Sequence, residues 1–174
     1  MRFVVKGFTM VELILAMAII AIATLAMTSA LSFAISHQAD AMPRAQMTAL
    51  AQAYFDEIMA KRYDEQTPLG GLPACSASTS PCSASSAFDD GESRLLFDDV
   101  DDFHGLDEQP PLDAAGNPMT EYAAFRVQVS VTYPTALEQT SLGLTRTTDA
   151  KLVSLTVTTT DTKQMQFTLL RTNF

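Results

Sequence analysis

The fold of this chain is decided by the stretch Lys6-Gly7-Phe8-Thr9-Met10-Val11-Glu12-Leu13 and the apolar run that follows it. Between Leu13 and Met27 only Thr24 interrupts a run of Leu, Ile, Ala and Met. The segment from Phe8 to Ile35 holds 28 residues. As a helix it would be roughly 42 Å long, against roughly 30 Å for the hydrocarbon core of a bilayer. The sequence therefore predicts a membrane-spanning helix.

Glu12 is the residue that a plain membrane anchor does not explain. A carboxylate near the start of an apolar helix costs several kcal/mol unless something neutralises it. One interpretation is that Glu12 lies close enough to the membrane boundary to reach the lipid headgroups. The other is that Glu12 has a specific positively charged partner.

The order of a charge, Gly7, Phe8, Glu12 and an apolar block resembles the leader of type IV pilins and type II secretion pseudopilins. In that family a prepilin peptidase cleaves between the glycine and the aromatic residue and methylates the new amino terminus. The resemblance implies a leader of residues 1–7, cleavage between Gly7 and Phe8, and N-methylation of Phe8. Glu12 would then pair with the ammonium of a neighbouring subunit and set the register between subunits.

An ordinary secretory signal is the chief alternative. It has the same charged start, and the Ala-rich stretch from Ser29 to Ala34 imitates its cleavage site. The chain would then be a secreted domain that binds calcium or another ligand. Glu12 argues against this alternative, because nothing in an ordinary signal requires an acid in its apolar core.

Composition and charge indicate where the rest of the chain lies. With 174 residues, the chain has room for one domain besides the helix. The formal net charge of −9 leaves no basic stripe to neutralise phosphates, so we predict no nucleic-acid partner. Arg2 and Lys6 precede the apolar run, whereas Asp40 and Arg44 follow it. The positive-inside rule therefore predicts one pass through the inner membrane, with a cytoplasmic amino terminus and residues 36–174 in the periplasm.

The two cysteines, Cys75 and Cys82, lie in a Ser- and Ala-rich stretch. In an oxidising compartment this spacing predicts a disulfide that closes a short loop. A metal site is the alternative, but two cysteines without a nearby histidine fall short of the four ligands that zinc prefers.

The helical period continues beyond the apolar run. Apolar residues recur on one face at spacings of three and four: Met47, Leu50, Ala51, Tyr54 and Ile58. We expect one helix from Phe8 to about Tyr63, in which Pro43 removes a hydrogen bond and bends or breaks the helix. Near its end, Glu57 and Lys61 stand at i and i+4, which predicts an exposed ion pair.

Residues 64–118 are predicted to be loop with an acidic region. Nine acids gather there: Asp89, Asp90, Glu92, Asp98, Asp99, Asp101, Asp102, Asp107 and Glu108. An EF-hand template that starts at Asp99 fails, because Phe103 and His104 take the places of a ligand and the required glycine. We therefore predict no metal and no cofactor, and a looser calcium site remains the alternative to a solvated acidic loop.

Within the acidic region every third residue is apolar: Phe97, Val100, Phe103 and Leu106. These side chains are expected to attach the segment to the domain while its acids face water. The stretch Phe97–Leu106, together with Ala53–Ile58, resembles the minor pilins of mannose-sensitive haemagglutinin pili.

Beyond Pro118 the hydrophobic period changes to two, which is typical of half-buried strands. Three strands are predicted, at 125–133, 153–157 and 165–169, and Leu95–Phe97 is a candidate edge strand. The expected fold is α+β and pilin-like: a long amino-terminal helix, half membrane-spanning and half amphipathic, packed on an antiparallel sheet within residues 119–174.

The predicted function is structural. His37 and His104 are the two histidines of the chain; neither stands near a nucleophile, and we expect His104 to be exposed, so no catalysis is predicted. The resemblance implies a minor type IV pilin-like subunit that serves adhesion or pilus biogenesis, with prepilin peptidase, other pilin subunits and the inner membrane as partners. A type II secretion pseudopilin shares the leader and is the alternative.

Overall fold

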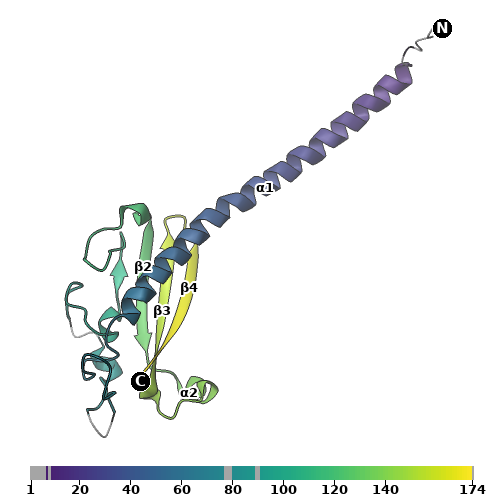
Figure 1. Cartoon of the computed structure of the whole chain (residues 1–174). Helices are drawn as coiled ribbons and strands as arrows, with labels where there is room; N and C mark the ends of the chain where they lie inside the picture. The colour runs from purple at the N-terminus through teal and green to yellow at the C-terminus, as the bar shows by residue number, and fades with distance from the viewer. Residues whose placement is uncertain (1–6, 8, 77–79, 89–90, 174) are drawn as a thin grey trace, which may run out of the picture. The chain divides into compact units, whose positions relative to one another are not determined.

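The computed structural model describes residue 7 and residues 9–76, 80–88 and 91–173, without the side chains of residues 36–40. The chain divides into two compact units, Met1–Pro43 and Arg44–Phe174. One helix, α1 (Met10–Met59), contributes to both units (Figure 1). Pro43 lies inside α1 and does not break it, since it removes one helical hydrogen bond among many.

The helix ends at Met59, before the expected Tyr63. Its last turn tightens, because the N–H of Lys61 donates to the carbonyl of Ile58 three residues earlier. Arg62 then exchanges backbone hydrogen bonds with another segment: its N–H donates to the Asp98 carbonyl and its carbonyl accepts from the Val100 N–H. This pairing with the acidic segment replaces a further turn of helix.

The second unit contains a four-stranded antiparallel sheet in the order β1-β2-β3-β4. The strands are β1 (Asp107–Glu108), β2 (Phe125–Thr132), β3 (Ala150–Thr159) and β4 (Gln164–Thr172). The three long strands confirm the prediction from period two, and the α+β class is confirmed with them. Thr162 adopts a φ of 64° in the turn between β3 and β4.

The prediction of an edge strand at Leu95–Phe97 was wrong. Leu95 and Leu96 form a turn in which the Leu96 N–H donates to the Ser93 carbonyl, and both side chains are exposed. The edge of the sheet is instead formed by β1, which pairs with β2. A run of apolar residues alone did not distinguish a strand from an exposed turn.

A short helix, α2 (Ala136–Leu142), connects β2 and β3 and was not predicted. It has a capping box, in which the Thr135 hydroxyl accepts from the Glu138 N–H and the Glu138 carboxylate accepts from the Thr135 N–H. Gly143 closes it with a φ of 68°. The Thr-x-x-Glu pattern and the glycine were readable signals of this helix.

The core lies between the carboxyl-terminal part of α1 and one face of the sheet, across which this part of the helix runs in Figure 1. The predicted helix face is buried there: Met47, Leu50, Ala51, Tyr54 and Ile58. Opposite it lie the inward-facing side chains of β2 and β3: Val127, Val129, Val131, Val153, Leu155 and Val157. Phe97, Val100 and Phe103 also join the core, as expected, and Leu106 packs against it partly buried.

Candidate functional site

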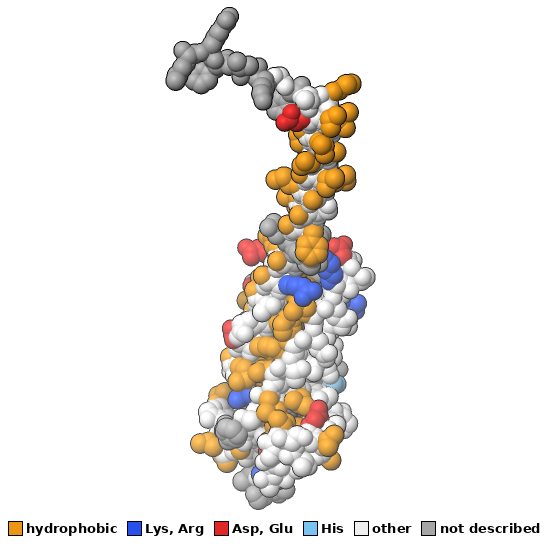
Figure 2. Space-filling view, turned by 90° about the vertical axis from the view of Figure 1, so that its right-hand side faces the viewer, with side chains coloured by type: hydrophobic (Ala, Val, Ile, Leu, Met, Phe, Trp, Pro, Cys, Tyr) orange, Lys and Arg blue, Asp and Glu red, His pale blue; other side chains and the backbone are white. Residues whose placement is uncertain are grey.

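The first candidate site is the apolar part of α1. Met10–Ile35 is long and apolar enough to cross a membrane, and its most apolar part is not buried among the described residues. Figure 2 shows hydrophobic side chains over this part of the helix on the face in view. An apolar surface of this size is stable only against lipid or other apolar surfaces.

Three hydroxyl groups inside the apolar segment, those of Thr24, Thr28 and Ser29, are satisfied within the helix itself. Thr24 Oγ1 donates to the Ile20 carbonyl at 2.9 Å, and Thr28 Oγ1 donates to the Thr24 carbonyl at 3.0 Å. Ser29 Oγ donates to the Leu25 carbonyl in the same way. These side chains therefore do not oppose burial in an environment without water.

Glu12 lies in the first turn of α1, where its N–H donates to Thr9 Oγ1 at 3.3 Å. Thr9 thus caps the helix, and the spacing Thr9-x-x-Glu12 is a helix-start signal that sequence reasoning had missed. The carboxylate is exposed, and within the described part of the chain it forms no ion pair. A partner for Glu12 must therefore come from outside the described residues.

Gly7 is exposed, and a Cβ placed on it meets no described atom within 4 Å. The fold itself therefore does not require glycine at this position. Phe8, the predicted mature terminus, lies outside the described residues, so its cleavage and N-methylation stay predictions.

Comparison with known proteins supports the same segment. Residues 2–28 match the family model of the prokaryotic N-terminal methylation motif. The comparison with curated proteins found no match, and neither did the comparison with solved structures. The motif is a prepilin-type leader. Together with the helix and the sheet it supports a type IV pilin-like protein, and the motif suggests a structural subunit.

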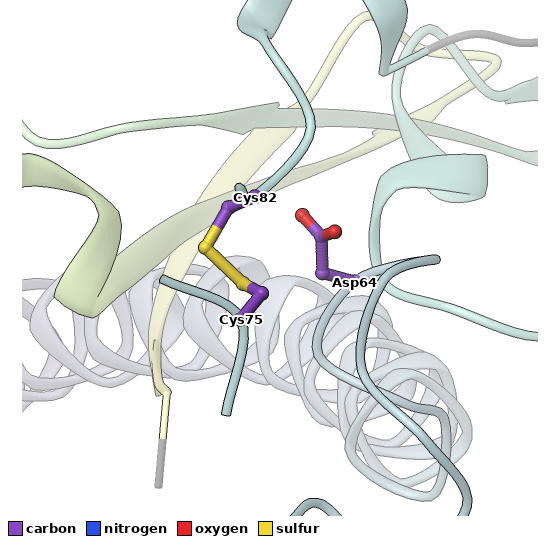
Figure 3. Close-up of side chains that lie close together, drawn as sticks. All are labelled: Asp64, Cys75 and Cys82. Atoms are coloured by element: carbon purple, nitrogen blue, oxygen red, sulfur yellow. A yellow bond between two sulfur atoms is a disulfide. The ribbon is translucent and has the colours of Figure 1, made fainter. Parts of the chain in front are cut away.

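The expected disulfide between Cys75 and Cys82 is present. Asp64 lies beside it, and Figure 3 shows its carboxylate near the two sulfur atoms. Because both sulfurs are used in the disulfide, they are not thiolate ligands, and the three residues do not form a zinc site. The side-chain amide of Asn173 donates to the Cys75 carbonyl at 3.0 Å, which ties the loop to the end of β4.

A second acidic group brings together carboxylate oxygens of Glu65, Asp98 and Asp99. Arg62 already pairs with two of the three, because Arg62 Nη2 lies 3.1 Å from Glu65 Oε2 and also contacts Asp98. Asp99 is buried, and burial together with the nearby Asp102 carboxylate raises its pKa to about 6. We make no calcium proposal for this group.

The expected exposed pair of Glu57 with Lys61 was wrong. Glu57 accepts two hydrogen bonds from Arg94, at 2.5 and 2.7 Å, while Lys61 Nζ donates to the Phe97 carbonyl at 2.6 Å. Arg94 also pairs with Glu108 at 3.0 Å. Glu57 therefore pairs with Arg94 from another segment of the chain, and not with Lys61 four residues along the helix. The pair with Arg94 is partly buried.

The expectation that the acids of the segment Phe97–Leu106 face water was also wrong in part. Asp99 and Asp101 are buried. Asp101 lies 2.7 Å from the ammonium of Lys151, which is itself buried and which also lies 3.0 Å from Asp64. We call Asp64, Asp101 and Lys151 the Lys151 cluster.

Sequence reasoning missed the Lys151 cluster. The strand pattern was started at Val153, although the same alternation extended by two residues places Lys151 on the core face. A lysine at such a position requires a buried acidic partner. The alternation thus indicated a buried lysine, but not which of the many acids would meet it.

His104 is partly buried and not exposed as expected. Its Nδ1 accepts a hydrogen bond from the Val131 N–H at 3.1 Å, and its ring packs edge-on against Phe88. These contacts place a loop against β2, which is a structural role. The side chain of His37 lies outside the description.

Proposed function

We propose that the protein is a minor type IV pilin-like subunit. A prepilin peptidase removes residues 1–7 and methylates Phe8. Before assembly, one helix anchors the subunit in the inner membrane, and residues 36–174 lie in the periplasm. It then enters a surface pilus or primes the assembly of one. The observation that carries this proposal is the methylation motif over residues 2–28. It lies at the start of an apolar helix whose most apolar part is exposed among the described residues.

The exposed helix supports transfer from membrane to filament. The most apolar part of this helix is not buried among the described residues, so lipid and the helices of other pilin subunits are interchangeable surroundings for it. Glu12 then fixes how neighbouring helices align. Its carboxylate neutralises the methylated amino terminus of a neighbouring subunit, and this pairing sets the register between the helices.

The finer proposal is a subunit like the minor pilin known as MshD of the mannose-sensitive haemagglutinin pilus, with a role in pilus biogenesis or adhesion. The support is the resemblance of Ala53–Ile58 and Phe97–Leu106. Tyr54 and Ile58 of the first stretch and Val100 and Phe103 of the second belong to one core cluster. The resemblance thus covers two segments that meet in the interior.

The mature amino terminus tests the proposal. Mass spectrometry of protein purified from membranes should find a methylated Phe8 as the first residue. In the Gly7→Leu variant the full-length precursor should accumulate, because a bulky side chain obstructs the peptidase, whereas the fold sets no requirement at position 7. A Thr9→Ser variant, which keeps the capping hydroxyl, is the control and should be processed normally.

A terminus beyond Ser29 would instead identify an ordinary secretory signal and overturn the proposal. The choice between pilus and secretion machine needs a second measurement. Surface pili sheared from cells should contain the protein. Loss of protein secretion with intact pili, after deletion of the gene, would assign it to a type II secretion system.

A further inference from the structure

Lys151 lies where a strand normally carries an apolar side chain. It is in phase with Val153, Leu155 and Val157 on the core face of β3, and its side chain is 0% exposed. Its ammonium nitrogen lies 4.4 to 5.8 Å from the ring centroids of Tyr63, Phe88 and Tyr133. A lysine nitrogen held in such surroundings is shielded from water and is placed against a small number of fixed neighbours.

Three oxygen atoms contact the lysine nitrogen. Nζ donates to the Tyr63 carbonyl at 2.7 Å and to Asp64 Oδ2 at 3.0 Å. The third contact, with Asp101 Oδ1 at 2.7 Å, is an ion pair without the geometry of a hydrogen bond. Since a carboxyl carbon lies about 1.2 Å from its oxygen, the carbon of Asp101 is at most about 4 Å from Nζ.

The two carboxylates have different surroundings. Asp64 also accepts hydrogen bonds from the N–H groups of Gln66 and Ser83 and from the Ser83 hydroxyl. Asp101 is 3% exposed, and neither of its oxygens accepts a hydrogen bond from the described residues. Burial raises the pKa of Asp101 to about 7, although the charge of Lys151 acts to lower it. Asp101 is therefore the carboxyl group that takes up a proton.

From this geometry we propose that Lys151 and Asp101 condense to an intramolecular amide, an isopeptide bond, with Asp64 as the base and acid that moves the protons. The bond would join β3 covalently to the segment that precedes β1. The inference does not depend on whether the chain enters a pilus, because it concerns only the interior of the Arg44–Phe174 unit.

The reaction needs no other reagent. A proton first passes from Nζ to Asp101, which leaves a neutral amine facing a neutral carboxylic acid. The lone pair of Nζ attacks the carboxyl carbon, a carbon–nitrogen bond forms, and Asp64 accepts a proton from Nζ. Asp64 returns this proton to the departing hydroxyl, the carbon–oxygen bond breaks and water leaves. An ammonium and a carboxylate have become one amide and one water, and Asp64 is unchanged.

Two effects make the condensation favourable here although it is unfavourable for free amines and acids in water. Burial removes the solvation that stabilises the separated charges. Fixing the two groups side by side is equivalent to a concentration of about 10⁵ to 10⁸ M in well-oriented systems. The Tyr63 and Asp64 contacts supply this orientation by holding the nitrogen against Asp101.

Peptide mapping of the full-length protein tests the proposal. After reduction of the disulfide, trypsin should release a branched product that joins residues 95–126, which contain Asp101, to residues 147–163, because a modified Lys151 is not cleaved. Its mass should be lower by one water than the sum of the two peptides. Lys151→Met and Asp101→Ala should lose the branched product, and Asp64→Asn should reduce it at least tenfold.

Asp99→Asn is the matched control, since Asp99 is a buried neighbour of Asp101 without a contact to Nζ in the described structure, and this variant should keep the branched product. Recovery of separate peptides 147–151 and 152–163 from the wild-type protein, with no mass deficit, would overturn the proposal. A branched product formed at the wild-type level in Asp64→Asn would overturn the role of Asp64.

Discussion

At the scale of single residues, burial decides how an aspartate behaves. Asp107 is exposed, and its hydrogen bonds from the Arg126 guanidinium lower its pKa. Asp99 lies in the same acidic region, yet burial raises its pKa to about 6. The surroundings of Asp107 therefore favour its ionised form, whereas the surroundings of Asp99 favour its protonated form. This difference has a measurable consequence for the stability of the protein.

Replacement of Asp99 by Asn should stabilise the protein at neutral pH. The folded state binds the Asp99 proton more tightly than the unfolded state, whose pKa is near 3.8. The stability from this protonation is present below about pH 4 and is lost as pH rises through about 6. Asn keeps the oxygen that accepts the Asp101 N–H and carries no charge. At pH 7.5 the variant should exceed the wild type by about 1 to 3 kcal/mol, and near pH 4 the difference should vanish.

Urea denaturation followed by tyrosine fluorescence measures this difference, because all four tyrosines lie within residues 44–174. Asp113→Asn is the control, and its effect on stability at neutral pH should have the opposite sign. Hydrogen bonds from Asn117 lower the pKa of Asp113, so that variant should lose stability at neutral pH and not at acid pH. A constant gap between Asp99→Asn and the wild type across the pH range would contradict the assignment.

At the scale of elements, Arg94 connects three parts of the second unit. From its loop it pairs with Glu57 of α1 and with Glu108 of β1. Glu108 also accepts the Tyr54 hydroxyl and the Leu112 N–H. The guanidinium lies over the rings of Phe97 and Phe103 as well. The helix, the loop and the short edge strand are thus held together by one partly buried cation.

Arg94→Ala should destabilise the second unit by about 3 to 5 kcal/mol, because Glu57 and Glu108 would remain buried without their counter-charge. Arg126→Ala is the matched control: its pair with Asp107 is exposed, and its loss should cost no more than about 1 kcal/mol. Urea denaturation of the two variants side by side measures the difference. Equal losses in the free energy of unfolding would contradict the larger contribution expected of Arg94.

At the scale of the whole molecule, the two units carry different features. The first unit carries the methylation motif and an apolar helix surface that is exposed among the described residues. The second unit holds the core, the sheet and the buried charges. A change in the first unit can therefore alter assembly without altering the folding of the second.

Glu12→Gln should leave cleavage at Gly7 and the stability of the second unit unchanged, while the amount of protein in sheared pili falls. A neighbour's ammonium would be buried without its counter-charge, which typically costs about 3 to 5 kcal/mol. Immunoblots of membranes and of sheared pili measure the two quantities. Thr9→Ala removes the hydroxyl that caps the helix and leaves the carboxylate, so it should assemble normally. Normal assembly of Glu12→Gln would refute the register role.

Several features of this protein follow from the sequence alone. The apolar run to Ile35, the helix face through Tyr54 and the alternation in β2 are repeated patterns, and each repeat specifies the same local geometry. The disulfide was predicted from the short spacing of two cysteines and an expected oxidising compartment, and the structure contains it. The methylation motif over residues 2–28 was recognised in the same way, because its signal is short and contiguous; cleavage after Gly7 and the role of Glu12 stay predictions.

The tertiary structure alone decided which charges meet. Lys151 reaches Asp64 and Asp101 across long distances in the chain, and Arg94 draws Glu57 away from Lys61. The edge strand at Asp107–Glu108 likewise depends on β2, since two residues carry no period of their own. Local patterns show which face of an element is buried. The partner of a buried charge is set by the packing of distant segments, where the cost of burial leaves a charge stable only beside its opposite.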